Sequence, residues 1–118
     1  MFKDLFSDYI MRNAMSKLLA SKHNLKLCNV DDALDVMGSG LHGCIFTLAD
    51  LGRDFFNLKT KIAGEVFQKF VNYNFKVAFI IPADHNLGNR VTELIRDHAR
   101  HNCIRFFETI DEAEKWIN

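Results

Sequence analysis

Three short apolar runs stand out along the chain, and each is flanked by polar or glycine residues. They span residues 43–48 (GCIFTL), 76–81 (KVAFII) and 103–107 (CIRFF). Apolar runs of this length are typical of strands that are covered on both faces, as in parallel sheets. Pro82 ends the second run, because proline has no N–H to donate to a sheet. The pattern therefore predicts three buried strands.

A long amphipathic segment lies between the first two runs. Residues 61–73 carry apolar side chains at helical spacing, and Thr60 stands where an N-cap belongs. Gly64 falls inside this predicted helix, where glycine costs up to about 1 kcal/mol relative to alanine. We interpret Gly64 as a site of close packing. The predicted apolar stripe consists of Ile62, Val66, Phe67, Phe70 and Val71.

Three other helices are predicted from caps and apolar stripes. Asn29 caps a helix over residues 30–37 that ends at Gly38. Another helix opens at Asn86 or Asn89, and a capping box of Thr109 and Glu112 starts the last one. The side chains expected to face inward are Val30, Ala33, Leu34 and Met37 in the first, Val91, Leu94, Ile95, His98 and Ala99 in the second, and Ala113, Trp116 and Ile117 in the third.

The alternation of strands and helices predicts an α/β fold with a largely parallel sheet. A length of 118 residues, without a linker or repeat, corresponds to one domain over residues 1–118. Residues 1–24 are ambiguous. Their apolar spacing favours a helix over 7–21, while residues 25–28 can close a strand. We expect one sheet of about four to five strands and about four helices.

Charge and cysteine content limit the expected partners and the expected cellular compartment. Fifteen basic and fifteen acidic residues cancel, and the basic residues between 96 and 105 are interrupted by Asp97, so nucleic acid is not an expected partner. A net charge of zero favours self-association, including a homodimer. Three cysteines without a CxxC pair indicate free thiols in a reducing cytoplasm. No signal peptide or apolar segment of about 20 residues is present, so no membrane contact is expected.

The central segment carries a family resemblance. The run DFFNLKTKIAGEVFQKFVNY, followed by KVAFII, resembles the core signature of a bacterial family of domains of unknown function, DUF4180. The segment VDDALDVM and the tail with ARHNCIRFF and DEAEKW look similar too, and the resemblance covers roughly residues 25–118. In the family pattern a glycine follows the threonine, whereas this chain has Lys61. The family strand runs into a Gly-Asp pair, whereas here Pro82 and Ala83 precede Asp84.

The element order is similar to that of STAS domains, the fold of sulphate transporters and anti-sigma-factor antagonists. That resemblance implies an N-terminal strand pair, with a hairpin over residues 8–12 and 17–21 in place of the helix. It also implies a regulatory serine or threonine at the junction where Thr60 stands.

Polar residues follow the first two strands and mark a candidate site. Ligands of open α/β sheets bind beyond the carboxyl ends of strands, and a helix N-terminus attracts anions. A small anion is therefore a candidate ligand; the alternative interpretation is that Thr60 serves only as a cap. The candidate anion-binding residues are Arg53, Lys59, Thr60, Lys61, Asp84 and His85. The candidate partner-binding residues are Asp50, Asp54, Phe55 and Phe56, since one of two adjacent phenylalanines can be exposed while the other enters the core.

Two other constellations are interpreted as structural. His98, His101 and Cys103 do not supply a convergent set of zinc ligands, so no metal site is predicted. Asp84, His85 and Asn86 with Asp50 or Asp54 resemble an acid–base pair, but no nucleophile elbow, P-loop or GxGxxG accompanies them. Neither a catalytic residue nor a cofactor is predicted, and an enzyme is the less favoured interpretation.

Two functions remain as hypotheses. The first is a STAS-like regulatory or protein-interaction module that acts through residues 50–61 and the following helix, with a protein partner or a second copy. The alternative is a binder of small anionic ligands, or a minor enzyme, with a pocket between residues 49–60 and 82–89 that contains Arg53, Lys59 and His85.

Overall fold

The computed structural model describes residues 16–118, and its centre is a parallel sheet of three strands in the order β1-β2-β3. The strands are β1 (Gly43–Thr47), β2 (Lys76–Ile80) and β3 (Ile104–Phe107). Cys44 of β1 lies opposite Val77 of β2, which in turn faces Ile104 of β3. The three apolar runs of the sequence are therefore the three strands, and the predicted α/β class is confirmed.

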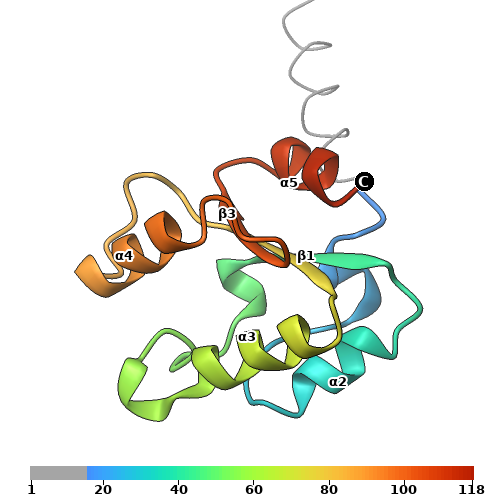
Figure 1. Ribbon diagram of the computed structural model, residues 1–118, viewed down its shortest axis with the longest axis horizontal. Coiled ribbons are helices and arrows are strands. Elements are labelled where there is room, and N and C mark those ends of the chain that lie inside the picture. The colour runs from blue at the N-terminus through green and yellow to red at the C-terminus, as the bar shows by residue number, and fades with distance from the viewer. Residues whose placement is uncertain (1–15) are drawn as a thin grey trace, which may run out of the picture.

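Four α-helices cover this sheet in the described part of the chain. They are α2 (Asp32–Met37), α3 (Ile62–Asn72), α4 (Asn89–Asp97) and α5 (Ile110–Ile117). In Figure 1 α2 and α3 lie below the sheet, α5 lies above it, and α4 stands to the side of β3. The predicted number of helices is confirmed.

The two faces of the sheet hold two separate cores. On the side of α2 and α3, the buried side chains include Phe46, Phe79 and Ile104 from the strands, and Val91 of α4 belongs to the same cluster. On the opposite side, Ile45 and Ala78 pack with Ala113 and Ile117 of α5. Alternation of side chains along each strand produces this division, because successive residues point to opposite faces.

The sheet is smaller than predicted. In place of a fourth and a fifth strand, the described residues contain two isolated parallel bridges, Leu19 with Ile45 and Leu27 with Leu51. Residues 16–21 form neither arm of the expected hairpin nor the end of the expected helix: a turn leads to Leu19 and then to the 3-10 helix η1 (Ala20–His23). The rest of the predicted 7–21 helix and the 8–12 strand lie outside the described residues.

Several details of the helices also differ from expectation. Val71 of α3, which was expected to face inward, is 38% exposed, and Ala99 is exposed and lies beyond the end of α4. In α2 the side chains of Ala33 and Val36 are buried, whereas Leu34 is 49% exposed. A helix of six residues has room for one contact face, and Ala33 with Val36 occupies it, so Leu34 turns to solvent. The expected close packing at Gly64 is absent, because a Cβ atom there would meet nothing within 4 Å.

Two of the four predicted caps, Asn29 and Thr109, make the expected hydrogen bonds. Asn29 accepts a hydrogen bond from the Asp32 N–H, and the Asp32 carboxylate accepts one from the Asn29 N–H. Thr109 caps α5 by accepting from the Glu112 N–H. Asn89 is the first residue of α4, but that helix has no side-chain cap. None of the helices described in residues 16–118 combines the length and the apolar character needed to cross a membrane.

Candidate functional site

The loop from β1 to α3 is built on two 3-10 turns, η2 (Leu48–Asp50) and η3 (Leu58–Thr60). Asp50 is only 6% exposed, and its carboxylate accepts hydrogen bonds from the Thr47 N–H at 2.8 Å and the Thr47 hydroxyl at 3.0 Å. This carboxylate holds the chain at the exit of β1. Its burial removes Asp50 from the surface that a partner can reach, contrary to expectation, while Asp54 is exposed.

The junction with α3 differs from the predicted N-cap. The helix begins at Ile62, and its N-cap position is Lys61, which has a left-handed backbone with φ 61°. Thr60 supports the junction from one residue earlier: its hydroxyl donates to the Asn57 carbonyl at 2.7 Å and accepts from the Ile62 N–H at 3.3 Å. Lys61 is the position at which the resembling family pattern has glycine, the residue that adopts this conformation most easily.

The adjacent phenylalanines Phe55 and Phe56 differ in burial. Phe55 is 1% exposed, and its ring lies 5.8 Å from that of Phe79 in β2. Phe56 is half-buried and meets the Phe55 ring edge-on at 5.0 Å. Phe55 is therefore a core residue and cannot anchor a partner, whereas one side of Phe56 remains accessible.

Phe56 lies between two adjoining hollows of about 430 and about 390 Å³. Both hollows lie between the β1–α3 loop and residues 87–90, and both are lined by Phe56, Asn57 and Leu87. Leu48 and Arg53 line the larger hollow, and the smaller one is lined by side chains that include Leu58, Lys59 and Arg90. We call these two hollows together the leucine groove.

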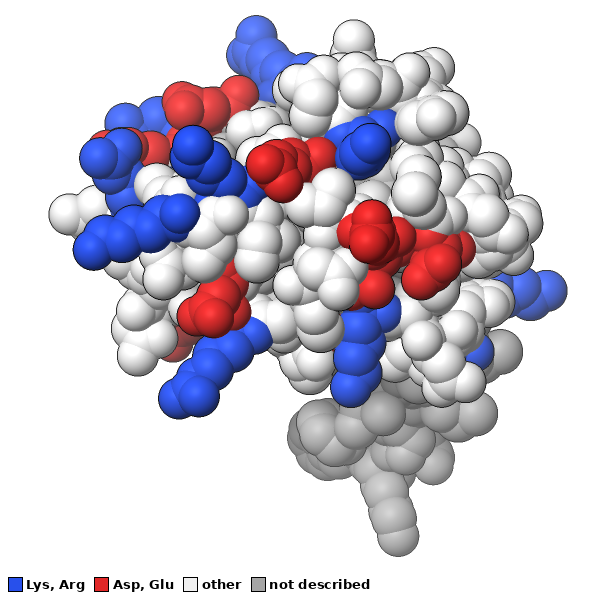
Figure 2. All heavy atoms as spheres, turned by 90° about the horizontal axis from the view of Figure 1, so that it is seen from below, with Lys and Arg blue, Asp and Glu red and all other residues white. Residues whose placement is uncertain are grey.

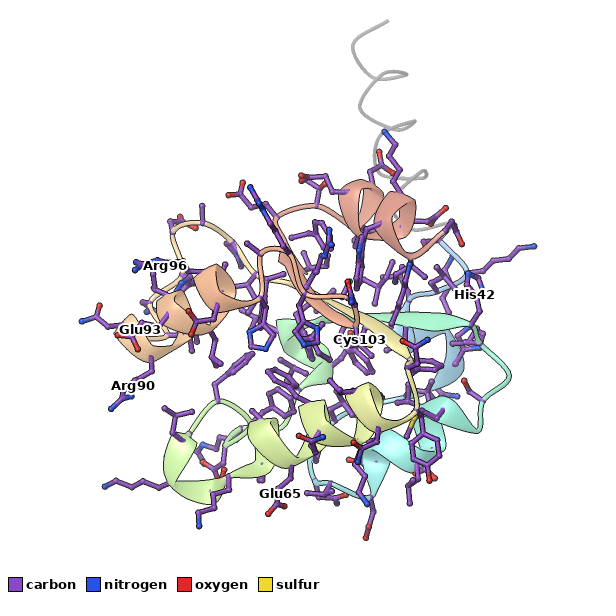
Figure 3. The ribbon with its side chains drawn as sticks, viewed as in Figure 1. His42, Glu65, Arg90, Glu93, Arg96 and Cys103 are labelled. Carbon is purple, nitrogen blue, oxygen red and sulfur yellow. The ribbon has the colours of Figure 1, made fainter. Side chains whose placement is uncertain are left out.

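Apolar and basic groups meet in the leucine groove. Three of the exposed large apolar side chains of the described chain line it: Leu48 (37% exposed), Leu58 (44%) and Leu87 (38%). Its charged lining residues are Arg53, Lys59 and Arg90, with no carboxylate among them. Figure 3 shows Arg90 projecting at the start of α4, and Figure 2 shows basic side chains concentrated at the same end of the molecule, with acidic ones interspersed.

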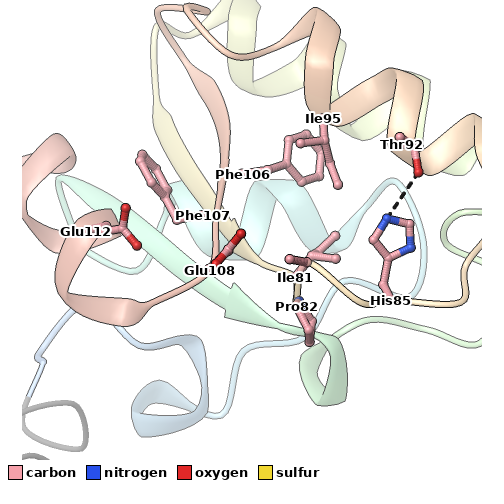
Figure 4. Close-up of a pocket in the computed structure, with 10 residues that line it drawn as sticks. Ile81, Pro82, His85, Thr92, Ile95, Phe106, Phe107, Glu108 and Glu112 are labelled. Carbon is pink, nitrogen blue, oxygen red and sulfur yellow. Dashed lines mark hydrogen bonds between the residues drawn. The ribbon is translucent and has the colours of Figure 1, made fainter.

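A separate pocket of about 490 Å³ lies beyond the carboxyl ends of β2 and β3 (Figure 4). We call it the β2–β3 pocket. Its apolar lining consists chiefly of Ile81, Pro82, Ile95, Phe106 and Phe107. Its polar lining residues are His85, Thr92, Glu108 and Glu112.

The predicted anion-site residues are divided between these two places. Arg53 and Lys59 line the leucine groove, His85 lines the β2–β3 pocket, and Asp84 is exposed and lines neither. Both ring nitrogens of His85 are engaged, since Nδ1 accepts from the Leu87 N–H at 3.2 Å and Nε2 lies 3.3 Å from the Thr92 hydroxyl. The expected single pocket containing Arg53, Lys59 and His85 is therefore not formed.

The histidines near β3 have structural contacts. His101 Nδ1 accepts hydrogen bonds from the N–H groups of Cys103 and Ile104, both at 3.0 Å. Burial, followed by the nearby charges of His98 and Arg105, lowers the pKa of His101. Cys103 is 4% exposed, and residues 16–118 contain no group of three or more His, Cys, Asp or Glu side chains placed to hold a metal ion.

Fold and site together define a small α/β domain with a three-stranded parallel sheet, and with the leucine groove and the β2–β3 pocket at its carboxyl edge. The chain belongs to the family described as domain of unknown function DUF4180, whose model matches residues 12–117. Comparison with curated proteins and with solved structures gave no significant match. The family description assigns no activity, so the function is inferred from the site.

Sequence reasoning missed the exposed leucines and both glutamates of these hollows. Leu58 and Leu87 are single apolar residues among polar loop neighbours, a pattern that fits an exposed position as well as a buried one. Glu108 directly follows β3. Ligands of open α/β sheets bind beyond the carboxyl ends of strands, and applying this rule to the third strand as well would have singled out Glu108.

Proposed function

We propose that this domain is a non-enzymatic protein-interaction module whose leucine groove receives a segment of a partner protein. The observation that carries the proposal is the convergence of Leu48, Leu58 and Leu87 around the half-buried Phe56. Exposed apolar side chains are common singly, but apolar side chains gathered in a hollow with a polar rim mark interaction sites.

The two hollows suggest the form of the bound segment. Phe56 and Leu87 line both of them, so the groove offers two neighbouring places for large apolar side chains. Desolvated aromatic or aliphatic anchors in such places carry most of the energy of a protein interface. We therefore expect a segment with two large apolar side chains.

Charge restricts the partner further. The cationic lining residues Arg53, Lys59 and Arg90 have no carboxylate beside them in the groove lining, so they favour a segment that carries Asp or Glu next to its apolar anchors. The face of α3 turned away from the core adds polar groups such as Glu65, which is labelled in Figure 3. The partner-binding surface thus includes the 50–61 loop of the sequence prediction, together with residues 87–90.

The loop under the groove is anchored in the core at two points, which favours recognition without a costly rearrangement. Phe55 locks the loop into the aromatic core, and the Asp50 carboxylate fixes its start. A regulatory role of the STAS type would use Thr60: a phosphate there would break its bond to the Asn57 carbonyl and place negative charge beside Lys59 and Lys61. That charge would repel an acidic partner.

A peptide-display selection on the purified full-length chain tests the proposal. We expect enriched peptides to combine two large apolar residues with acidic neighbours. Leu87→Asp and Leu58→Asp should each weaken a selected peptide by at least about tenfold, because a carboxylate would replace an apolar contact. Leu34→Asp is the matched control, since Leu34 is 49% exposed on α2 and outside the groove.

The phosphoryl switch is tested in the same assay. Thr60→Glu should weaken the selected peptide more than Thr60→Val, which removes the hydroxyl without adding charge. Selection of basic peptides, or equal losses for Leu34→Asp and the two groove variants, would refute the interaction site. Sedimentation equilibrium of the unmodified chain and of Leu87→Asp distinguishes a second copy as the occupant.

A further inference from the structure

We propose that the β2–β3 pocket binds a small ligand composed of an apolar body and a protonated amine. This site is distinct from the leucine groove and does not depend on the proposed interaction function. Four features of the described residues carry the inference: the topology around the pocket, its size, its apolar walls and the sign of its charges.

The topology places a crevice at this edge of the sheet. β2 continues into α4, whose Val91 is buried in the core on the α3 side, whereas β3 continues into α5 in the core on the opposite side. β2 and β3 are neighbouring strands, so the chain leaves them toward opposite faces. A crevice opens outside the carboxyl ends of two such strands, and this is where ligands of open α/β sheets bind.

The dimensions and walls fit a small organic molecule. A volume of about 490 Å³ falls within the range of about 300–1,000 Å³ that is usual for ligand pockets. Ile95 and Phe106 come from the core on the α3 side, and Phe107 comes from the core on the α5 side. Their half-buried side chains leave apolar surface in the pocket that a ring or chain can cover.

The charges of the pocket select a cation. Glu108 and Glu112 line it, and no lysine or arginine does. Glu112 accepts a hydrogen bond from the Thr109 hydroxyl at 2.8 Å through Oε1, which leaves its other oxygen available. Glu108 is exposed and has no hydrogen bond to another side chain among the described residues. An ammonium group can bind either carboxylate, whereas an anion would be repelled by them.

At the opposite end of the pocket, the His85 ring nitrogens already have hydrogen-bond partners. Nδ1 of His85 accepts from the Leu87 N–H, so a neutral ring carries its proton on Nε2 and donates it to the Thr92 hydroxyl. Figure 4 shows this pair at the α4 end and Glu112 near α5. The pocket is therefore polarised, and we place the amine beside Glu108 and Glu112 with the apolar body against Ile95 and Phe106.

Three probes of similar shape test the inference by amide NMR of the full-length chain: 2-phenylethylamine, 2-phenylethanol and 3-phenylpropionate. We expect the amine to shift the amide signals of His85, Thr92 and Glu108, and to bind at least about tenfold more tightly than the carboxylate. Glu108→Gln should weaken the amine by about tenfold, the effect of one charge-assisted hydrogen bond, and leave the neutral alcohol unchanged. Glu93→Gln on α4, outside the pocket lining, is the matched control and should change nothing.

The inference is overturned if none of the three probes shifts these signals at millimolar concentration. Tighter binding of 3-phenylpropionate than of the amine would also overturn it, because the carboxylates would then not determine selectivity. Equal weakening by Glu108→Gln and Glu93→Gln would do the same, since the effect would reflect net charge rather than the pocket.

Discussion

Replacing Lys61 by glycine should stabilise this protein. Lys61 has φ 61°, a conformation that costs a residue with a Cβ atom about 1–2 kcal/mol. Glycine avoids that cost, but it adds about 0.4–1 kcal/mol of conformational entropy to the unfolded chain. The hydrogen bonds of this residue come from its backbone, from its N–H to the Leu58 carbonyl and from the Glu65 N–H to its own carbonyl, so the substitution preserves them. The net gain is about 0.5–1 kcal/mol.

The measurement is the free energy of unfolding from urea titration, together with a rise in Tm of about 2–4 °C. Lys61→Ala controls for the lost charge, because alanine keeps the Cβ atom and should gain almost nothing. Lys59→Gly is the positional control: Lys59 lies in the 3-10 turn η3 without a positive φ, so glycine there should destabilise by about 0.5–1 kcal/mol. Equal effects of glycine at 59 and 61 would refute the reasoning from backbone conformation.

Two further predictions concern titratable side chains. Cys28 should react rapidly with a thiol reagent, because it is exposed. Cys44 should stay unmodified until the protein is unfolded, since burial raises its pKa to about 12. Peptide mass spectrometry identifies the labelled thiols, and early labelling of Cys44 would contradict the prediction. Because the pKa of His101 is lowered in the folded protein, the unfolded chain takes up a proton near pH 6.5 while the folded chain resists it. The free energy of unfolding should therefore fall as pH drops below about 6.5. Above that pH it should be insensitive to this group. His101→Asn, which offers an amide oxygen as acceptor, should reduce the difference in urea stability between pH 7.5 and 5.5, and an unchanged difference would exclude this group as its source.

The class of the fold was readable from local sequence. Contiguous apolar runs marked β1, β2 and β3 to within one residue, because a strand covered on both faces needs apolar side chains at successive positions. Thr109 and Asn29 marked helix starts, since capping depends on neighbours three residues away. The resemblance of the central segment also identified the family correctly, with a matched span of residues 12–117.

The errors occurred where a residue's environment depends on distant parts of the chain. Leu34 fits an apolar stripe, yet the short α2 turns it outward; Gly64 suggested close packing, yet no other element approaches it. The segments around Leu19 and Leu27 pair through single bridges rather than full strands. Local periodicity contains no information on which neighbouring element covers a side chain.

The sequence by itself determined the α/β class and the three strands, and it singled out the loop between β1 and α3 as a candidate site. Only the tertiary structure decided how the residues of that loop are arranged. It buries Asp50 and Phe55, brings Leu87 beside Leu58, and places His85 in a different pocket from Arg53. The physical reason is that strand and helix formation depend on neighbouring residues, whereas a groove or pocket depends on the paths of loops separated by tens of residues.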